Sequence, residues 1–178
     1  DLTGRVVREP LLAIDYLAMR VPGMTPAYRR LQSIVHDIIG TAFSEVVIID
    51  FSCADEVVAK LLQQFLEDDA RDAFFVFRGV HEPHRDQIEV VLSRQGLAAV
   101  VETEPGSFEL VGVHTADEEE AWRMLEEKGS IEPEEEERLF DEARSREAVA
   151  SLVRRGLAFR SPTSRRLHAL SHLVAHLL

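Results

Sequence analysis

One stretch of the sequence constrains the fold more than any other: an unbroken run of apolar, mostly β-branched residues leads directly into a helical pattern. The run, Val46–Phe51, is interrupted only by Asp50 and is typical of a strand buried on both faces of a parallel sheet. Ser52 can cap the helix that follows, where apolar residues recur at i, i+3, i+4 and i+7. These residues are Ala54, Val57, Val58, Leu61, Leu62, Phe65 and Leu66. A buried strand followed by an amphipathic helix indicates the α/β class.

The same alternation of strand and helix patterns continues through residues 1–115. Two further helices are predicted, one that begins at Thr25-Pro26 and one over His84–Gln95. The turn Pro105-Gly106 predicts that a final edge strand returns beside its neighbour. The strands are expected at Leu11–Arg20, Val46–Phe51, Phe74–Phe77, Ala98–Val101 and Phe108–Val113. This order predicts a mostly parallel sheet with crossover helices.

The pattern changes at Ala116, where three helices are predicted in succession. They are followed by two short extended segments around the polar turn Ser161–Arg166, and then by a last helix. The helices are expected at Asp117–Glu127, Pro133–Asp141, Ser145–Arg155 and Ser171–Leu178, and the extended segments at Leu157–Arg160 and Leu167–Leu170. We therefore expect a first domain over residues 1–115 and a small α+β domain over residues 116–178.

Charge is unevenly distributed along this acidic chain. The whole sequence has 20 basic and 32 acidic residues, a net charge of −12. Asp117 to Glu142 is strongly acidic, whereas Arg144 to the end carries seven arginines and a single acid, Glu147. An acidic protein is repelled by nucleic acid at long range, but a local arginine stripe can still make contact. The alternative is a set of solvated helix faces.

Composition restricts the class of protein further. Apolar residues make up 46 % and charged residues 29 % of the chain, which is ordinary for a folded globular protein. No apolar run is long enough to span a bilayer, and no signal peptide is expected at the start. The single cysteine, Cys53, cannot form an internal disulfide, which favours a reducing cytoplasm.

Two motifs in the first half carry a resemblance to a known family. Arg20-Val21-Pro22-Gly23-Met24-Thr25 resembles the turn into the first helix, and Val47–Asp55 the strand-to-helix stretch, of the STAS (sulfate transporter and anti-sigma factor antagonist) domain. The resemblance covers residues 5–114 and implies a partner-switching protein that is bound at one edge. Asp55 is followed by Glu56 instead of a hydroxyl residue, so phosphorylation is not expected there; Glu56 can supply a constant negative charge. The implied partner-binding residues are Asp50, Ser52, Cys53, Asp55, Glu56, His81 and His84.

The second half resembles a winged-helix domain. The resemblance rests on Ser151–Arg160, the polar turn and Arg165–Leu170, and it covers residues 116–178. In that family the third helix reads the major groove and the wing contacts phosphate or the minor groove. The implied DNA contacts are Arg144, Ser145, Arg146, Arg154, Arg160, Arg165 and Arg166. Many winged helices instead dock on proteins or dimerise, so DNA contact, protein docking and a homodimer all stay open.

Catalytic and metal motifs receive little support. Cys53, His81 and His84 fall at expected strand ends, where α/β sheets place their ligands, but their spacing matches no closed zinc motif. His168, His172 and His176 recur every four residues and share one helical face if the last helix begins that early. Three neutral imidazoles could bind a metal or take up protons, but a solvated or subunit-facing stripe is the simpler interpretation. The sequence has no Gly-rich phosphate loop. We expect no enzyme, cofactor or metal; the alternative is a ligand- or metal-binding enzyme that uses the edge around Cys53, His81 and His84.

Taken together, the patterns predict a non-enzymatic cytoplasmic regulator with a protein partner. Its STAS-like half would bind that partner, while its winged helix would dock on DNA or on another protein. This interpretation requires two units with separate interiors that meet near Thr115. It also predicts that a chain cut at about residue 115 keeps a folded first domain.

Overall fold

The computed structural model describes residues 13–18, 55–60, 62–63, 73–78, 80 and 82–175. The strand expected at Val46–Phe51 and the helix expected from Thr25 lie outside the described residues. In the first part of the chain the elements are β1 (Ala13–Ala18), the π-helical turn η1 (Asp55–Ala59), β2 (Ala73–Arg78), α4 (Glu82–Gln95), β3 (Ala98–Glu104) and β4 (Ser107–Gly112).

A four-stranded sheet organises this first part, with the strand order β1-β2-β3-β4. β2 and β3 are parallel, whereas β1 with β2 and β3 with β4 are antiparallel. The α/β class is confirmed, but the expectation of a mostly parallel sheet is wrong for the strands described. The reason is clearest at β3 and β4, which are joined only by Pro105 and Gly106, with Gly106 at a φ of 81°. A two-residue connection can only join antiparallel strands.

The second part of the chain combines four helices with a small antiparallel sheet. Its strand order is β5-β7-β6. The first three predicted helices are present with ends shifted by up to two residues, and the last begins one residue earlier than expected; its predicted end at Leu178 lies outside the described residues. The unpredicted element, β5, is only two residues long. The elements are α5 (Ala116–Lys128), β5 (Ser130–Ile131), α6 (Pro133–Leu139), α7 (Ala143–Arg154), β6 (Ala158–Arg160), β7 (Leu167–Ala169) and α8 (Leu170–Ala175).

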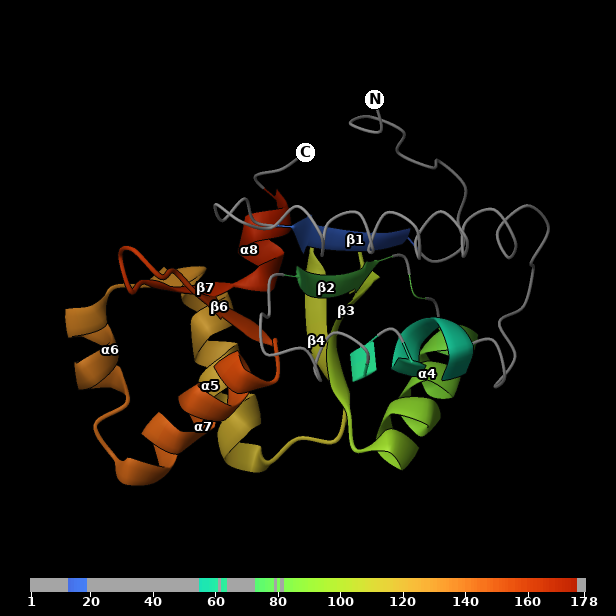
Figure 1. Ribbon diagram of the computed structural model, residues 1–178, viewed down its shortest axis with the longest axis horizontal. Coiled ribbons are helices and arrows are strands. Elements are labelled where there is room, and N and C mark those ends of the chain that lie inside the picture. The colour runs from blue at the N-terminus through green and yellow to red at the C-terminus, as the bar shows by residue number, and fades with distance from the viewer. Residues whose placement is uncertain are drawn as a thin grey trace.

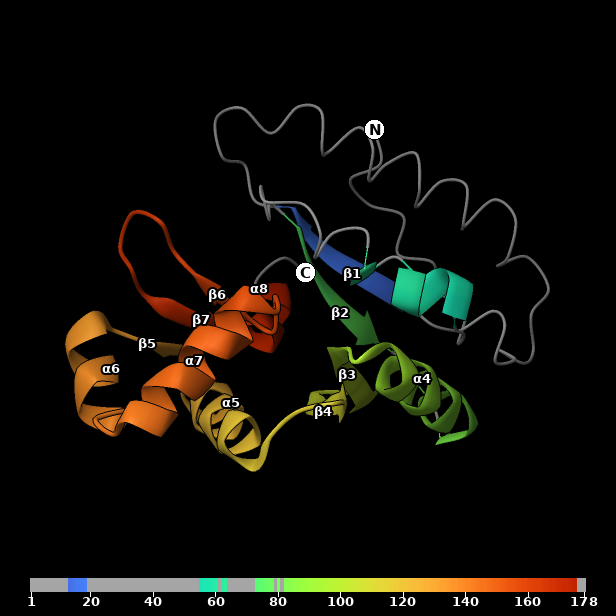
Figure 2. The same cartoon turned by 60° about the horizontal axis from the view of Figure 1, so that its bottom comes forward.

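The central strands β2 and β3 of the larger sheet are buried on both faces. Side chains alternate between the faces of a strand, so Phe75 and Phe77 lie on the opposite face from Phe74 and Val76, and all four are buried. Helix α4 lies against one side of the sheet, and α5, α7 and α8 lie on the other (Figure 1). Helix α8 contacts β1 and β2 of the larger sheet as well as β7 of the smaller one (Figure 2).

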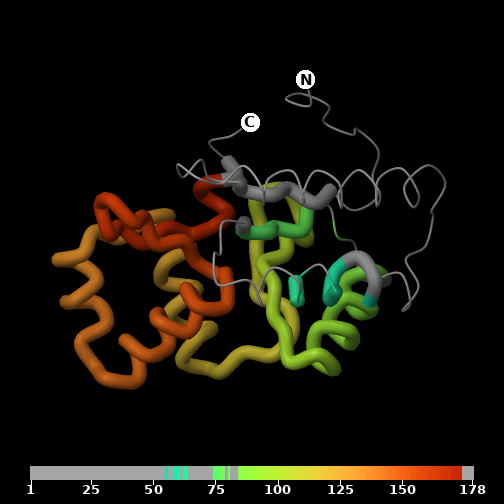
Figure 3. The backbone as a smooth tube through the Cα atoms, in the orientation of Figure 1, coloured from blue at the N-terminus to red at the C-terminus, as the bar shows by residue number. Residues whose placement is uncertain are grey.

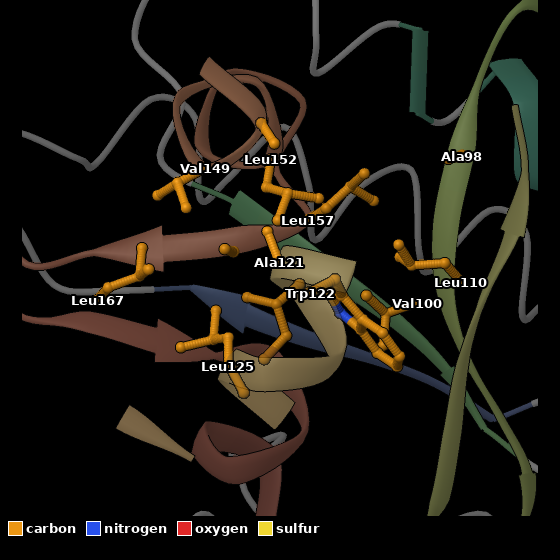
Figure 4. Close-up of a cluster of buried hydrophobic side chains, with 14 of the residues drawn as sticks. Ala98, Val100, Leu110, Ala121, Trp122, Leu125, Val149, Leu152, Leu157 and Leu167 are labelled. Carbon is orange, nitrogen blue, oxygen red and sulfur yellow. The ribbon is translucent and has the colours of Figure 1, made fainter. Parts of the chain in front are cut away.

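One continuous hydrophobic core joins the two parts of the chain. Figure 4 shows Val100 and Leu110 of the larger sheet beside Trp122 of α5. Phe74 of β2 also makes an edge contact with Phe159 of β6, with 5.4 Å between ring centroids. The cluster comprises Phe74, Val76, Ala98, Val100 and Leu110 of the larger sheet, together with Ala121, Trp122, Leu125, Ile131, Phe140, Ala148, Val149, Leu152, Leu157, Ala158, Leu167, Ala169 and Leu170.

The expectation of separate interiors is therefore wrong for the described residues. Helices of the second part cover a face of the sheet that would otherwise expose apolar side chains to water. The connection between β4 and α5 is short, as the tube in Figure 3 shows. The division into domains 1–115 and 116–178 stays a prediction. No helix within the described ranges is both long and apolar enough to cross a membrane.

Candidate docking surface

Most of the edge implied by the STAS resemblance lies outside the described residues. This holds for Asp50, Ser52, Cys53 and His81, and only the backbone of Glu56 is described, within η1. Asp55 is half-buried, and its Oδ1 accepts a hydrogen bond from Gln95 Nε2 at 3.3 Å. The partner-binding role of this edge therefore stays a prediction.

His84 belongs to the core-facing side of α4. It is 8 % exposed and precedes Ile88 and Leu92 by one and two helical turns, and both of these are fully buried. Its Nδ1 is buried and has no hydrogen-bond partner in the described part of the chain. No group of three or more His, Cys, Asp or Glu within the described part of the chain is arranged to hold a metal ion, although this does not test Cys53 or His81.

Helix α7 presents the first set of predicted contact residues on its outer face. Ala148, Val149 and Leu152 are buried, so the helix is anchored by one apolar stripe. The remaining positions include the exposed arginines 144, 146 and 154. The half-buried Ser145 donates from Oγ to the carbonyl oxygen of Glu142 at 2.9 Å and so helps to begin the helix.

The arginines of α7 are bound to acceptors within their own surface. Arg144 Nε lies 2.9 Å from Glu142 Oε2, and Arg154 Nη2 lies 2.8 Å from Glu147 Oε1. Arg146 Nη1 donates to the carbonyl oxygen of Asp141. Ion pairs as exposed as these contribute about 0–1 kcal/mol each, so they reduce the local charge without locking the side chains.

The turn between β6 and β7, with the residues that flank it, carries the second set of predicted contact residues. Both Nη atoms of Arg160 donate to the Glu136 carboxylate at 2.7 Å, and Arg166 Nη2 donates to Glu132 Oε1. The hydrogen bond to Glu136 is the main reason that the pKa of Arg160 is raised. Arg165 is exposed, lies at a φ of 62°, and has no side-chain hydrogen bond or ion pair with any residue described here.

The structure brings the seven implied contact residues to two neighbouring features, α7 and the β6–β7 turn. Four of the six arginines pair with a glutamate of the same surface, and Arg146 pairs with a backbone carbonyl. Among the described residues, Arg165 alone of these arginines lacks such a contact. The arginine stripe read from the sequence is therefore largely neutralised.

A buried charged network at Glu118 was not identified from the sequence. Its carboxylate accepts hydrogen bonds from Thr115 N at 2.8 Å, Ser151 Oγ at 2.6 Å and Arg155 Nη1 at 3.0 Å. Arg155 Nη2 also donates to the Val113 carbonyl oxygen at 2.5 Å. The network ties the end of α7 to the start of α5 and to the segment after β4.

Charge and hydrogen bonds outweigh burial at Glu118. Burial raises the pKa of its carboxyl. The hydrogen bonds from Ser151 and Thr115 and the charge of the Arg155 guanidinium lower the pKa by more than burial raises it, so the pKa is below its ordinary value. The spacing of Thr115 and Glu118, with each side chain bonded to the other backbone, is a capping box. That spacing is a sequence signal for the helix start, but it cannot identify Ser151 and Arg155 as partners.

Two titratable groups lie near α8. Burial raises the pKa of Glu126, opposed by a hydrogen bond with Ser171. Burial lowers the pKa of His168, assisted by the charges of Arg166 and His172 and opposed by Glu132. The His168 ring stacks on Phe159 at 5.8 Å, a packing role that needs no metal. His168 belongs to strand β7 and His172 to helix α8, so the expectation that the histidines share one helical face is wrong for His168. His176 lies outside the described residues.

We expect Glu126→Gln to gain stability relative to the natural chain as pH rises. A raised pKa means that the folded state binds the Glu126 proton more tightly than the unfolded state does. That contribution to stability is complete below the unfolded pKa and is lost as pH rises through the folded one. The amide mimics the protonated form, so the variant should be at least as stable as the natural chain at pH 7.

Urea unfolding between about pH 4 and pH 7 measures this difference. Glu127→Gln, at an exposed neighbouring position, controls for the loss of one charge from α5. A Glu126→Gln variant that becomes relatively less stable as pH rises would contradict the assignment.

Comparison of the chain with protein-family models, with curated proteins and with solved structures found no match.

Proposed function

We propose that this chain is a non-enzymatic regulatory protein that acts by binding other proteins, and that residues 116–175 form a winged-helix-like docking module. The order α5-β5-α6-α7-β6-β7, with the sheet order β5-β7-β6, supports this proposal. So does the winged-helix resemblance of Ser151–Leu170. The single cysteine is the basis for a cytoplasmic location, and the STAS-like role of residues 1–115 belongs to the same proposal.

The shared core changes how such a regulator would work. A partner-switching protein with two independent units could change their separation when a partner binds. Here, separation would expose Val100 and Leu110 on one side and Trp122 on the other. We therefore propose that α7 and the β6–β7 turn are carried on a single rigid body, so that binding does not depend on movement of one half against the other.

One observation favours a protein partner over DNA: the arginines that would meet phosphate are paired with acidic side chains. Residues 117–178 contain 10 basic and 14 acidic residues, a net charge of −4, so the surroundings also repel a polyanion. Non-specific DNA affinity derives mainly from unpaired cations that replace counterions. A protein surface with alternating charges can match this surface without that requirement.

We expect the full chain to bind duplex DNA weakly, with a Kd above about 100 µM at low salt, beyond the usual non-specific range. Fluorescence anisotropy with a duplex of mixed sequence measures this affinity. Saturable binding below that concentration that weakens steeply with salt would establish DNA contact and reject protein docking as the main role.

Docking on a protein is tested by capturing partners from a lysate of the source cells. The bait is the natural chain or one of two double variants in which arginines are replaced by glutamate. A partner that docks on α7 should be lost with Arg144→Glu/Arg146→Glu and retained with Arg123→Glu/Arg138→Glu, which changes the same charge at exposed positions on α5 and α6. Equal capture by both variants would show that α7 is not the docking surface.

A further inference from the structure

The two arginines at the base of the β6–β7 turn lie side by side. Arg160 is the last residue of β6 and pairs with Leu167 of β7. Arg166 immediately precedes Leu167 in the chain. Ser161 N donates to the Arg166 carbonyl oxygen at 2.9 Å, which holds the two ends of the turn together. Figure 2 shows this turn extending from the body of the molecule near α6.

The glutamates that bind these arginines are one helical turn apart. Glu136 N donates to the Glu132 carbonyl oxygen at 2.8 Å, so Glu132 and Glu136 follow each other along one side of the start of α6. Glu136 binds Arg160 and Glu132 binds Arg166. The two arginines therefore already bind two carboxylates that lie four residues apart on a helix.

These contacts leave the arginines open to exchange. The side chains of Arg160 and Arg166 are 31 % and 42 % exposed, and that of Glu132 is 51 % exposed. Arg166 Nε is buried and has no acceptor among the described residues. The exposed Arg166–Glu132 pair contributes little to stability, whereas the bidentate Arg160–Glu136 pair is part-buried, with the Glu136 side chain 19 % exposed. An external carboxylate of matching geometry can therefore replace Glu132 more easily than Glu136.

We propose that Glu132 and Glu136 mask a binding site for an acidic helix, and that a protein partner docks by placing two carboxylates, four residues apart, on Arg160 and Arg166. This inference rests on the proposed function and specifies the chemistry of its partner. Glu132 and Glu136, which bind the arginines now, indicate the geometry expected of the partner: two glutamates on consecutive turns of a helix. Arg165, exposed on the same turn, adds a cation that the mask does not cover.

The test measures binding of labelled alanine-based helical peptides to the full chain by fluorescence anisotropy. One peptide carries glutamates at i and i+4 on one face; the second has the same composition with glutamates at i and i+2. The variant Glu132→Gln/Glu136→Gln removes the mask. Glu120→Gln/Glu127→Gln removes the same charge from exposed positions of α5 and is the matched control.

We expect the unmasked variant to bind the i, i+4 peptide about tenfold more tightly than the natural chain does, with a gain below about threefold for the control. The i, i+2 peptide should show the smaller gain with both variants. Trp122 fluorescence verifies that each variant is folded, and Glu132→Gln alone provides a milder version at the more exposed pair.

Three results would overturn the inference. Equal gains for the two double variants would attribute the effect to net charge, and no gain would show that the glutamates mask nothing. A larger gain for duplex DNA than for the i, i+4 peptide would identify phosphate as the ligand. The proposed function is tested separately, by partner capture with the Arg144 and Arg146 variants. A negative peptide result would therefore leave the docking role of α7 standing, and a negative capture result would leave the peptide result interpretable.

Discussion

A chain that ends at residue 115 is expected to lose its cooperative fold, contrary to the independent first domain that the sequence predicts. The cut removes α5, α7 and α8 from one face of the larger sheet. Phe74, Val76, Val100 and Leu110, now buried in the shared core, would then face water. Exposing large apolar side chains costs about 1.5–3 kcal/mol each, which is comparable to the whole stability of a small domain.

Circular dichroism of residues 1–115 and thermal unfolding of the full chain test this expectation together. Leu110→Ala in the sheet and Leu152→Ala in α7 are a matched pair, each expected to lose about 2–5 kcal/mol. Both variants should lower the midpoint temperature of the same unfolding transition. Its reporter is Trp122, the only tryptophan, which lies between the two parts. A folded fragment, or two transitions that respond separately to the two variants, would contradict a single core.

Replacing Glu118 by alanine is expected to destabilise the protein by about 2–3 kcal/mol, because Arg155 would lose its carboxylate partner and two further donors would lose their acceptor. The side chain of Glu118 is only 7 % exposed, so water cannot easily replace the lost acceptor. Glu120→Ala, at an exposed position on the same helix, should cost less than about 0.5 kcal/mol.

The pH dependence of this effect has a definite sign. The pKa of Glu118 is lowered in the folded state, so its contribution is present above the unfolded pKa and is lost as pH falls through the folded one. The stability difference between the natural chain and Glu118→Gln should therefore shrink in acid. A double-mutant cycle with Arg155→Ala measures their coupling, and additive losses at neutral pH would show that the pair is not coupled.

The Glu118 network also bears on the proposed docking surface. Ser151 and Arg155 lie at the end of α7, and Arg155 bonds to Val113 just after the larger sheet. Loss of Glu118 should therefore loosen α7 relative to the sheet as well as lower stability. Hydrogen exchange at α7, compared between the natural chain and Glu118→Gln, measures that loosening directly.

The local structure of the described residues followed from periodicity and turn chemistry in the sequence. Alternating and continuous apolar runs predicted β2, β3 and β4, and Pro105-Gly106 predicted the return between the last two. Helices α4, α5 and α7 followed from apolar residues three and four positions apart, and α6 from Pro133 at its start. These signals act between neighbours in the chain, so a single sequence contains them in full.

The sequence by itself determined most of the strands and helices among the described residues, with β5 as an exception. It also determined that both faces of β2 must be covered, since Phe74, Phe75, Val76 and Phe77 are consecutive apolar residues. Only the tertiary structure decided that helices of the second part cover one of those faces and merge the two interiors. It also decided that Arg160 meets Glu136, 24 residues away, and that Arg155 meets Glu118, 37 residues away. Such contacts depend on how whole elements pack, and the spacing of residues along the chain does not specify that packing.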